Sequence, residues 1–217
     1  MAPNVPKNIN LQYFLNILLI MFISGFVATQ VSTSKTILEG LDSQTTLINN
    51  TIYFSVIGLA IIFFILKKTR SLKKLLFILT VFMTMVLVDD VRKLMTNLAA
   101  QKNAVDVLLD AFFVWVFNVL LFTVWYWSLD RNGVENRSSA ERADIIFPQE
   151  DNQIKGWEDR KPGFLDYLFF SFYSCMALSP TETVVLSKKM KFLLMIQTSV
   201  SLVVLAMIAA RAINLIN

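Results

Sequence analysis

Residues 165–191 read LDYLFFSFYSCMALSPTETVVLSKKMK, and the path of this stretch decides the fold. The stretch begins with aromatic and aliphatic side chains, becomes polar at SPTET, and ends with closely spaced lysines. Such a sequence either crosses a membrane or enters it partway and returns to the same side, as the pore loop of a channel does. The two paths imply different topologies and different functions.

Length and capping signals bear on this choice. As a helix, residues 164–178 would span about 22 Å, which is short against a hydrocarbon core of about 30 Å. Ser179-Pro180-Thr181-Glu182 has the pattern of a capping box with proline at the first helical position, which predicts that the last helix begins there. We favour a complete but short crossing, because re-entrant backbone must be shielded by protein or line a cavity. We also expect re-entry to leave one basic cluster on the wrong side of the membrane.

The composition predicts a membrane protein. Hydrophobic residues make up 55% of the 217 residues, only 17% are charged, and the mean hydropathy is +0.57; soluble domains carry about 25% charged residues. The net charge of +4 comes from basic residues beside apolar runs, which favours the lipid bilayer as partner and argues against nucleic acid. With no histidine and only Cys175, the chain excludes an internal disulfide and zinc or haem sites built on histidine and cysteine. We expect no metal and no cofactor.

Apolar segments divide the chain. We predict an all-α, multi-pass transmembrane helical bundle with about six hydrophobic segments, the fifth short and either crossing or re-entrant: 11–31, 51–66, 75–94, 104–129, 164–178 and 192–216. Residues 1–129 would form a four-helix transmembrane region, 130–163 a hydrophilic loop, and 164–217 a short aromatic helix followed by a long transmembrane helix. The basic cluster at 67–74 predicts a cytoplasmic loop, which by alternation makes the 130–163 loop cytoplasmic too. Trp125-Tyr126-Trp127 is typical of a membrane interface.

Acidic residues gather where the third segment ends and the fourth begins. Asp89 and Asp90 precede two basic residues, and Asp106 and Asp110 stand four residues apart on one helical face. The favoured interpretation is a set of interfacial charges that form salt bridges. The functional alternative is an acidic vestibule for a cation, lined by both Asp106 and Asp110.

Polar side chains also lie within the last hydrophobic segment. Gln197, Thr198, Ser199 and Ser201 are expected either to hydrogen-bond between helices or to line a pore. We favour packing, because hydrogen bonds between helices are the common use of such residues in membranes.

The C-terminal half carries a resemblance to a known family. The order is WYWSLDRNG at 125–133, IIFP at 145–148, LDYLFFSF at 165–172, then the polar SPTETVVLSKKMK and a long apolar helix. It resembles a family of small bacterial inner-membrane proteins classed as a domain of unknown function. The resemblance implies the fold and the membrane location, and Pro180-Thr181-Glu182 departs from that family's loop.

A more distant similarity is to the pore module of tetrameric cation channels, which has an outer helix, an aromatic pore helix, a filter and an inner helix. The chain follows that order but has no Thr-Val-Gly-Tyr-Gly run and no glycine after Gly163. Potassium filters expose stacked backbone carbonyls in conformations that glycine makes accessible. A less selective pore of hydroxyls and a ring of Glu182 side chains is what the similarity allows.

Three functional classes follow from these patterns. An enzyme is not expected, because acid–base or nucleophilic chemistry would have to proceed without histidine. We favour a channel-like protein of the bacterial inner membrane that conducts monovalent cations as a homo-oligomer. Its candidate pore or ion-interacting residues are Ser179, Thr181, Glu182, Thr183, Asp89, Asp90, Asp106 and Asp110. The alternative is a non-catalytic structural or accessory subunit of a membrane complex.

Overall fold

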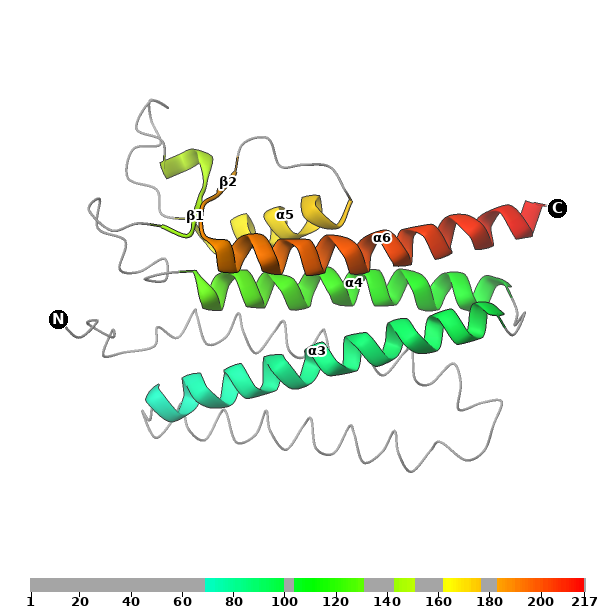
Figure 1. Ribbon diagram of the computed structural model, residues 1–217, viewed down its shortest axis with the longest axis horizontal. Helices are drawn as coiled ribbons and strands as arrows, with labels where there is room; N and C mark the ends of the chain where they lie inside the picture. The colour runs from blue at the N-terminus through cyan, green and yellow to red at the C-terminus, as the bar shows by residue number, and fades with distance from the viewer. Residues whose placement is uncertain (1–68, 100–103, 131–142, 151–161, 177–182, 217) are drawn as a thin grey trace. The chain divides into compact units, whose positions relative to one another are not determined.

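The computed structural model describes residues 69–99, 104–130, 143–150, 162–176 and 183–216. This part of the chain is mainly helical (Figure 1): α3 (Thr69–Ala99), α4 (Ala104–Leu129), α5 (Phe164–Cys175) and α6 (Lys188–Ile216), with a short 3-10 helix η1 (Pro148–Glu150) and two strands, β1 (Ile145–Ile146) and β2 (Val184–Val185). The predicted segments 11–31 and 51–66 lie outside the described residues.

Two of these helices are long and apolar enough to cross a membrane. They are Val107–Leu129 in α4 and Lys188–Ile213 in α6, each with a mean hydropathy of 2.3. The predicted helix at 104–129 coincides with α4. The membrane class is therefore supported by two helices, and the full number of crossings stays a prediction.

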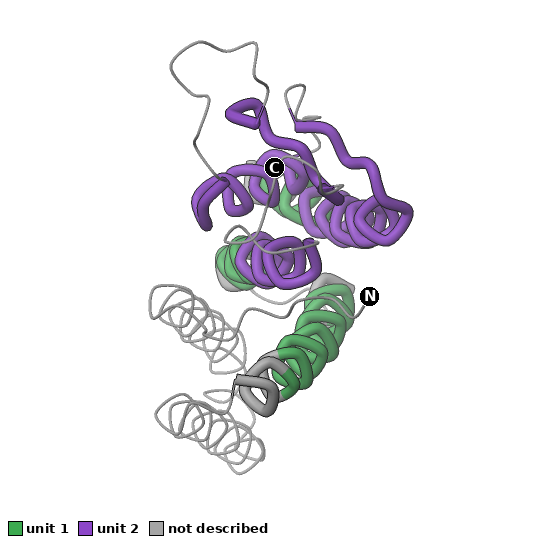
Figure 2. Tube along the Cα trace, turned by 90° about the vertical axis from the view of Figure 1, so that its left-hand side faces the viewer, with its two compact units in different colours: residues 1–117, 207–217 green, residues 118–206 purple. Residues whose placement is uncertain are grey.

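The chain divides into two compact units, which Figure 2 shows in different colours. The first comprises residues 1–117 and 207–217, and the second comprises residues 118–206. In the first unit, α3 buries Leu79, Met83, Leu87 and Leu94. Their spacing of four and seven residues places them on one face of the helix, which is the pattern of a helix packed on one side.

The second unit has an aromatic core. Its fully or nearly fully buried side chains come from the end of α4, from β1 and the residue after it, from α5 and from the start of α6: Phe122, Tyr126, Ile145, Phe147, Tyr167, Phe170 and Met190. The Tyr126 and Phe170 rings meet edge to face at 4.9 Å, as do the Phe147 and Tyr167 rings. Such pairs add to the free energy gained from burial alone, so α5 is fixed in rotation against α4.

A small antiparallel ribbon replaces the predicted start of the last helix. Ile145 pairs with Val185 and Ile146 with Val184, and α6 begins only at Lys188. The expectation of a helix from Ser179 was therefore wrong. Two adjacent valines favour an extended backbone, and Ser187 provides the helix start instead, because its hydroxyl accepts a hydrogen bond from the Met190 amide at 3.3 Å.

Hydrogen bonds to α4 trace the path of α5. The Tyr167 hydroxyl, near the start of α5, donates to Asp130 at the end of α4 (2.5 Å). One turn later, the Ser171 hydroxyl donates to the carbonyl of Val119 (2.7 Å). At the end of α5, Cys175 accepts a long contact from Asn118. Because α5 has 12 residues, it rises only about 18 Å and runs back along the second half of α4.

The chain then returns to the end where α5 began. Strand β2 lies on β1, and the amide of Asp144, just before β1, donates to Asp130 (3.1 Å). The ammonium of Lys189, in the first turn of α6, donates to the carbonyl of Leu129 (2.5 Å). Figure 1 shows α5 beside the start of α6, with β1 and β2 at that same end. Helices α5 and α6 therefore start at the same end of the α4–α6 pair, which is the geometry expected of the re-entrant alternative, and the path of the segment through a membrane stays a prediction.

Candidate functional site

Helix α5 is held by a set of buried polar contacts, which we call the α5 polar network. It joins side chains of α4, α5 and α6: Asn118, Tyr126, Ser171, Cys175, Gln197 and Ser201. Each of them is fully or almost fully buried. Polar groups in an apolar environment must find partners, so these contacts fix the depth and rotation of α5.

Gln197 occupies the centre of the network. Its amide nitrogen donates to the carbonyl and the hydroxyl of Ser171, at 3.1 and 2.7 Å, and lies 3.0 Å from the Cys175 sulfur. Its amide oxygen accepts a hydrogen bond of 2.5 Å from the Tyr126 hydroxyl. A single α6 side chain therefore binds α5 on one side and α4 on the other.

Two further contacts hold the C-terminal end of α5. The Ser201 hydroxyl donates to the carbonyl of Cys175, which is one of the helix-end carbonyls without an intrahelical partner. The Asn118 amide nitrogen makes contacts of 3.4 Å with the Cys175 sulfur and the Gln197 carbonyl. Within the described residues no donor reaches the Asn118 side-chain oxygen. The end of α5 is thus anchored at mid-length of α4, where that oxygen is a buried acceptor.

The start of α5 is capped by its own sequence. Gly163 is the N-cap residue, and its amide donates to the Asp166 carboxylate (2.5 Å). Asp166 is the third helical residue, and its side chain reaches back to the cap. Its negative charge also lies at the positive end of the helix dipole.

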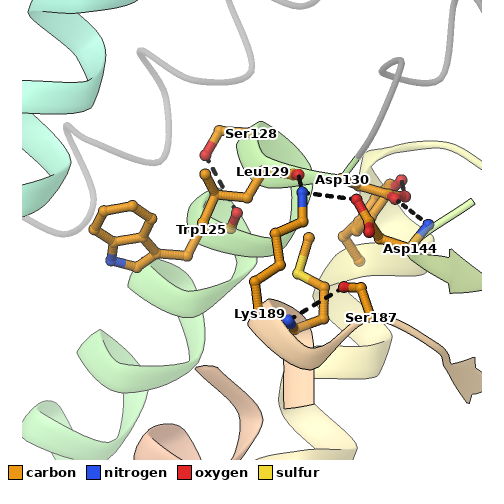
Figure 3. A network of polar contacts seen from close by, with 9 residues as sticks. Trp125, Ser128, Leu129, Asp130, Asp144, Ser187 and Lys189 are labelled. Atoms are coloured by element: carbon orange, nitrogen blue, oxygen red, sulfur yellow. Dashed lines mark hydrogen bonds and ion pairs between the residues drawn. The ribbon is translucent and has the colours of Figure 1, made fainter. Parts of the chain in front are cut away.

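A second group of polar contacts lies where α4 ends and α6 begins (Figure 3), and we call it the ribbon anchor. Besides its contact with Leu129, Lys189 forms an ion pair with Asp144 (2.7 Å), whose side chain is only 4% exposed. Asp130 accepts from the Asp144 amide and from Tyr167. The ribbon anchor therefore ties β1 and α5 to α4, and β1 to the start of α6.

The predicted pore residues fall mostly outside the described part. Ser179, Thr181 and Glu182 lie in the undescribed segment 177–182. Thr183 is described and immediately precedes β2, at the end of the unit where α6 begins. The segment 177–182 thus joins the end of α5, at mid-length of α4, to the ribbon.

The first unit holds the predicted acidic residues. Asp89 pairs with Arg92 (2.7 Å) and with Lys93 (2.8 Å), as the salt-bridge interpretation expects. Asp90 is 3% exposed and Asp110 is 7% exposed, and the two are close enough for their charges to interact. No described donor reaches one of the Asp90 carboxylate oxygens. The backbone of Asp106 belongs to α4, one residue before the candidate span.

Part of this site was predicted from the sequence. Gln197 and Ser201 do hydrogen-bond between helices, whereas the Thr198 hydroxyl bonds to carbonyls of its own helix. Tyr126, which was assigned to a membrane interface, has a fully buried side chain, and its depth in a membrane stays a prediction. The ribbon anchor was missed; its one sequence signal is Asp144 directly before the apolar IIF run.

Within the described residues no group of three or more potential metal ligands gathers. Comparison with models of protein families, with curated proteins and with solved structures found no match to this chain.

Proposed function

We propose that the chain is a channel-like membrane protein in which α4, α5 and α6 form an outer helix, a re-entrant helix and an inner helix. The observation that carries the proposal is the path of α5, which enters and leaves at the same end of the α4–α6 pair. A short helix of this kind brings the segment after it to mid-depth of the membrane. Channels select ions with rings of backbone carbonyls or charged side chains in the segment that lines the pore.

The distribution of basic residues supports this path. When α5 re-enters, Lys188, Lys189 and Lys191 join the side of the 130–163 loop, which is expected to be cytoplasmic, and only Arg211 moves the other way. More basic residues then lie inside, as short cytoplasmic loops require. The expectation that re-entry misplaces a basic cluster was wrong, because it left out this transfer.

The conducted species we propose is a monovalent cation, in a homo-oligomer that lines the pore with 177–182. Without glycine in this segment, stacked carbonyls of the potassium-filter kind are not expected. Hydroxyl and carboxylate groups of Ser179, Thr181, Glu182 and Thr183 would instead meet the ion. The buried pair Asp90 and Asp110 is the candidate for a second cation contact.

Cation flux into vesicles that contain the purified full-length chain tests this proposal. Wild-type protein is expected to dissipate a monovalent cation gradient, and Glu182→Gln to slow the flux about tenfold, because a nearby unit charge changes a cation's energy by about 1 kcal/mol or more. Glu158→Gln, in the hydrophilic loop, makes the same charge change and should leave the flux unaltered. Folded wild-type protein that passes no ions would favour the accessory-subunit alternative.

A further inference from the structure

The exposed side of α6 combines a basic end with an apolar stripe, and we call it the lysine–apolar face. It consists of Lys188, Lys191, Phe192, Met195 and Leu202. The three apolar side chains are 64–65% exposed, and both lysines are exposed as well. Spacings of three, four and seven residues place all five on one side of the helix.

Within the described part of the chain, the two lysines of this face differ from their neighbour Lys189 in their contacts. Lys189 points elsewhere, to Asp144 and Leu129 (Figure 3). Among the described residues no carboxylate lies within ion-pair distance of Lys188 or Lys191. The first turn of α6 also contains no acidic residue. Positive side chains at the positive end of a helix dipole are electrostatically unfavourable. An anion bound from outside would therefore stabilise this turn.

The position of the lysines defines which anion fits. Lys188 is the first residue of the candidate membrane span, so its ammonium lies at the level of lipid headgroups. From Lys191 to Leu202 the helix rises about 16 Å, which is half of a hydrocarbon core of about 30 Å. The apolar stripe therefore has the length of one acyl chain within one leaflet.

We infer that the lysine–apolar face binds an anionic phospholipid, with its phosphate between Lys188 and Lys191 and an acyl chain along Phe192, Met195 and Leu202. The re-entrant path of α5 puts this face on the side expected to be cytoplasmic, where anionic lipids are concentrated. The binding does not depend on ion conduction. It would hold the first turn of α6 in place, next to the ribbon anchor.

Native mass spectrometry of the full-length protein with phosphatidylglycerol or phosphatidylcholine tests the inference. Wild-type protein should retain phosphatidylglycerol in preference to phosphatidylcholine. The double variant Lys188→Gln/Lys191→Gln should bind it about 30-fold more weakly, because each lysine near a charged membrane contributes about 1 kcal/mol. Lys188→Arg/Lys191→Arg should retain it, and Lys155→Gln/Lys161→Gln, in the hydrophilic loop, should behave as wild type.

Three results would overturn the inference. Unchanged phosphatidylglycerol binding by the Lys→Gln double variant would remove the lysines from the site. Glycerol 3-phosphate has no acyl chain. If it bound as tightly as phosphatidylglycerol, the site would recognise a phosphate and not a lipid. Disulfide-linked dimers of Met195→Cys in a Cys175→Ser background would show that a second copy of the chain covers the stripe.

Discussion

Gln197 is the residue on which the position of α5 depends most. Its side chain donates to Ser171 and accepts from Tyr126, so that α4 and α5 meet through one α6 amide. A glutamine within a hydrophobic segment predicts, from the sequence alone, that its side chain forms a hydrogen bond there. It does not indicate with which helix, because the partner depends on how three helices rotate against one another. The role of Tyr126 could not be predicted for the same reason, since the aromatic run around it suits an interface equally well.

Leucine has nearly the same size as glutamine but cannot form hydrogen bonds. Gln197→Leu should therefore lower the stability of the protein. The Tyr126 hydroxyl would lose its acceptor and Ser171 one donor, at a cost of about 1–2 kcal/mol in the free energy of unfolding. Thermal unfolding in detergent measures the loss. Thr198→Val is the matched control, because the Thr198 hydroxyl bonds only within α6, and it should change stability by less than about 0.5 kcal/mol. Equal effects of the two substitutions would contradict the role assigned to Gln197.

The ribbon is the element that sequence patterns identify least well. Helix α4 was predicted with its bounds, because a mainly apolar run of that length has few other interpretations. Strands of two residues carry too few side chains for a period to appear, and the pairing of Ile145 with Val185 joins positions forty residues apart. A capping pattern at 179–182 therefore outweighed the two valines, and the start of α6 was misplaced.

The ribbon should contribute to stability mainly through its buried side chain, Ile145. Ile145 is fully buried, so Ile145→Ala should lower the free energy of unfolding by about 2–4 kcal/mol. Val184 is 51% exposed, and Val184→Ala should change it by less than about 0.5 kcal/mol. Chemical unfolding of both variants provides the comparison. A small loss for Ile145→Ala would mean that β1 and β2 are not a fixed part of the second unit.

At the scale of the whole molecule, the composition predicts a membrane protein, and two helices of the required length and hydropathy support that class. The direction of α5 could not be obtained from its length, because a segment of 15 residues suits both a short crossing and a half-crossing. Long-range contacts set the direction of α5 against α4: Tyr167 with Asp130, Lys189 with Leu129, and the pairing of β1 with β2. None of these leaves a local signature in the sequence.

The sidedness of three single cysteines tests the re-entrant path most directly. In a Cys175→Ser background, which retains a small polar group in the α5 polar network, cysteines replace Ser138, Val184 and Asn217. An impermeant maleimide is applied to intact cells, and again after permeabilisation to show that each site can react. The account predicts that Ser138→Cys and Val184→Cys react from the same side and Asn217→Cys from the opposite one. Labelling of Val184→Cys from the side opposite to both Ser138→Cys and Asn217→Cys would mean that residues 164–178 cross the membrane, and would contradict the account.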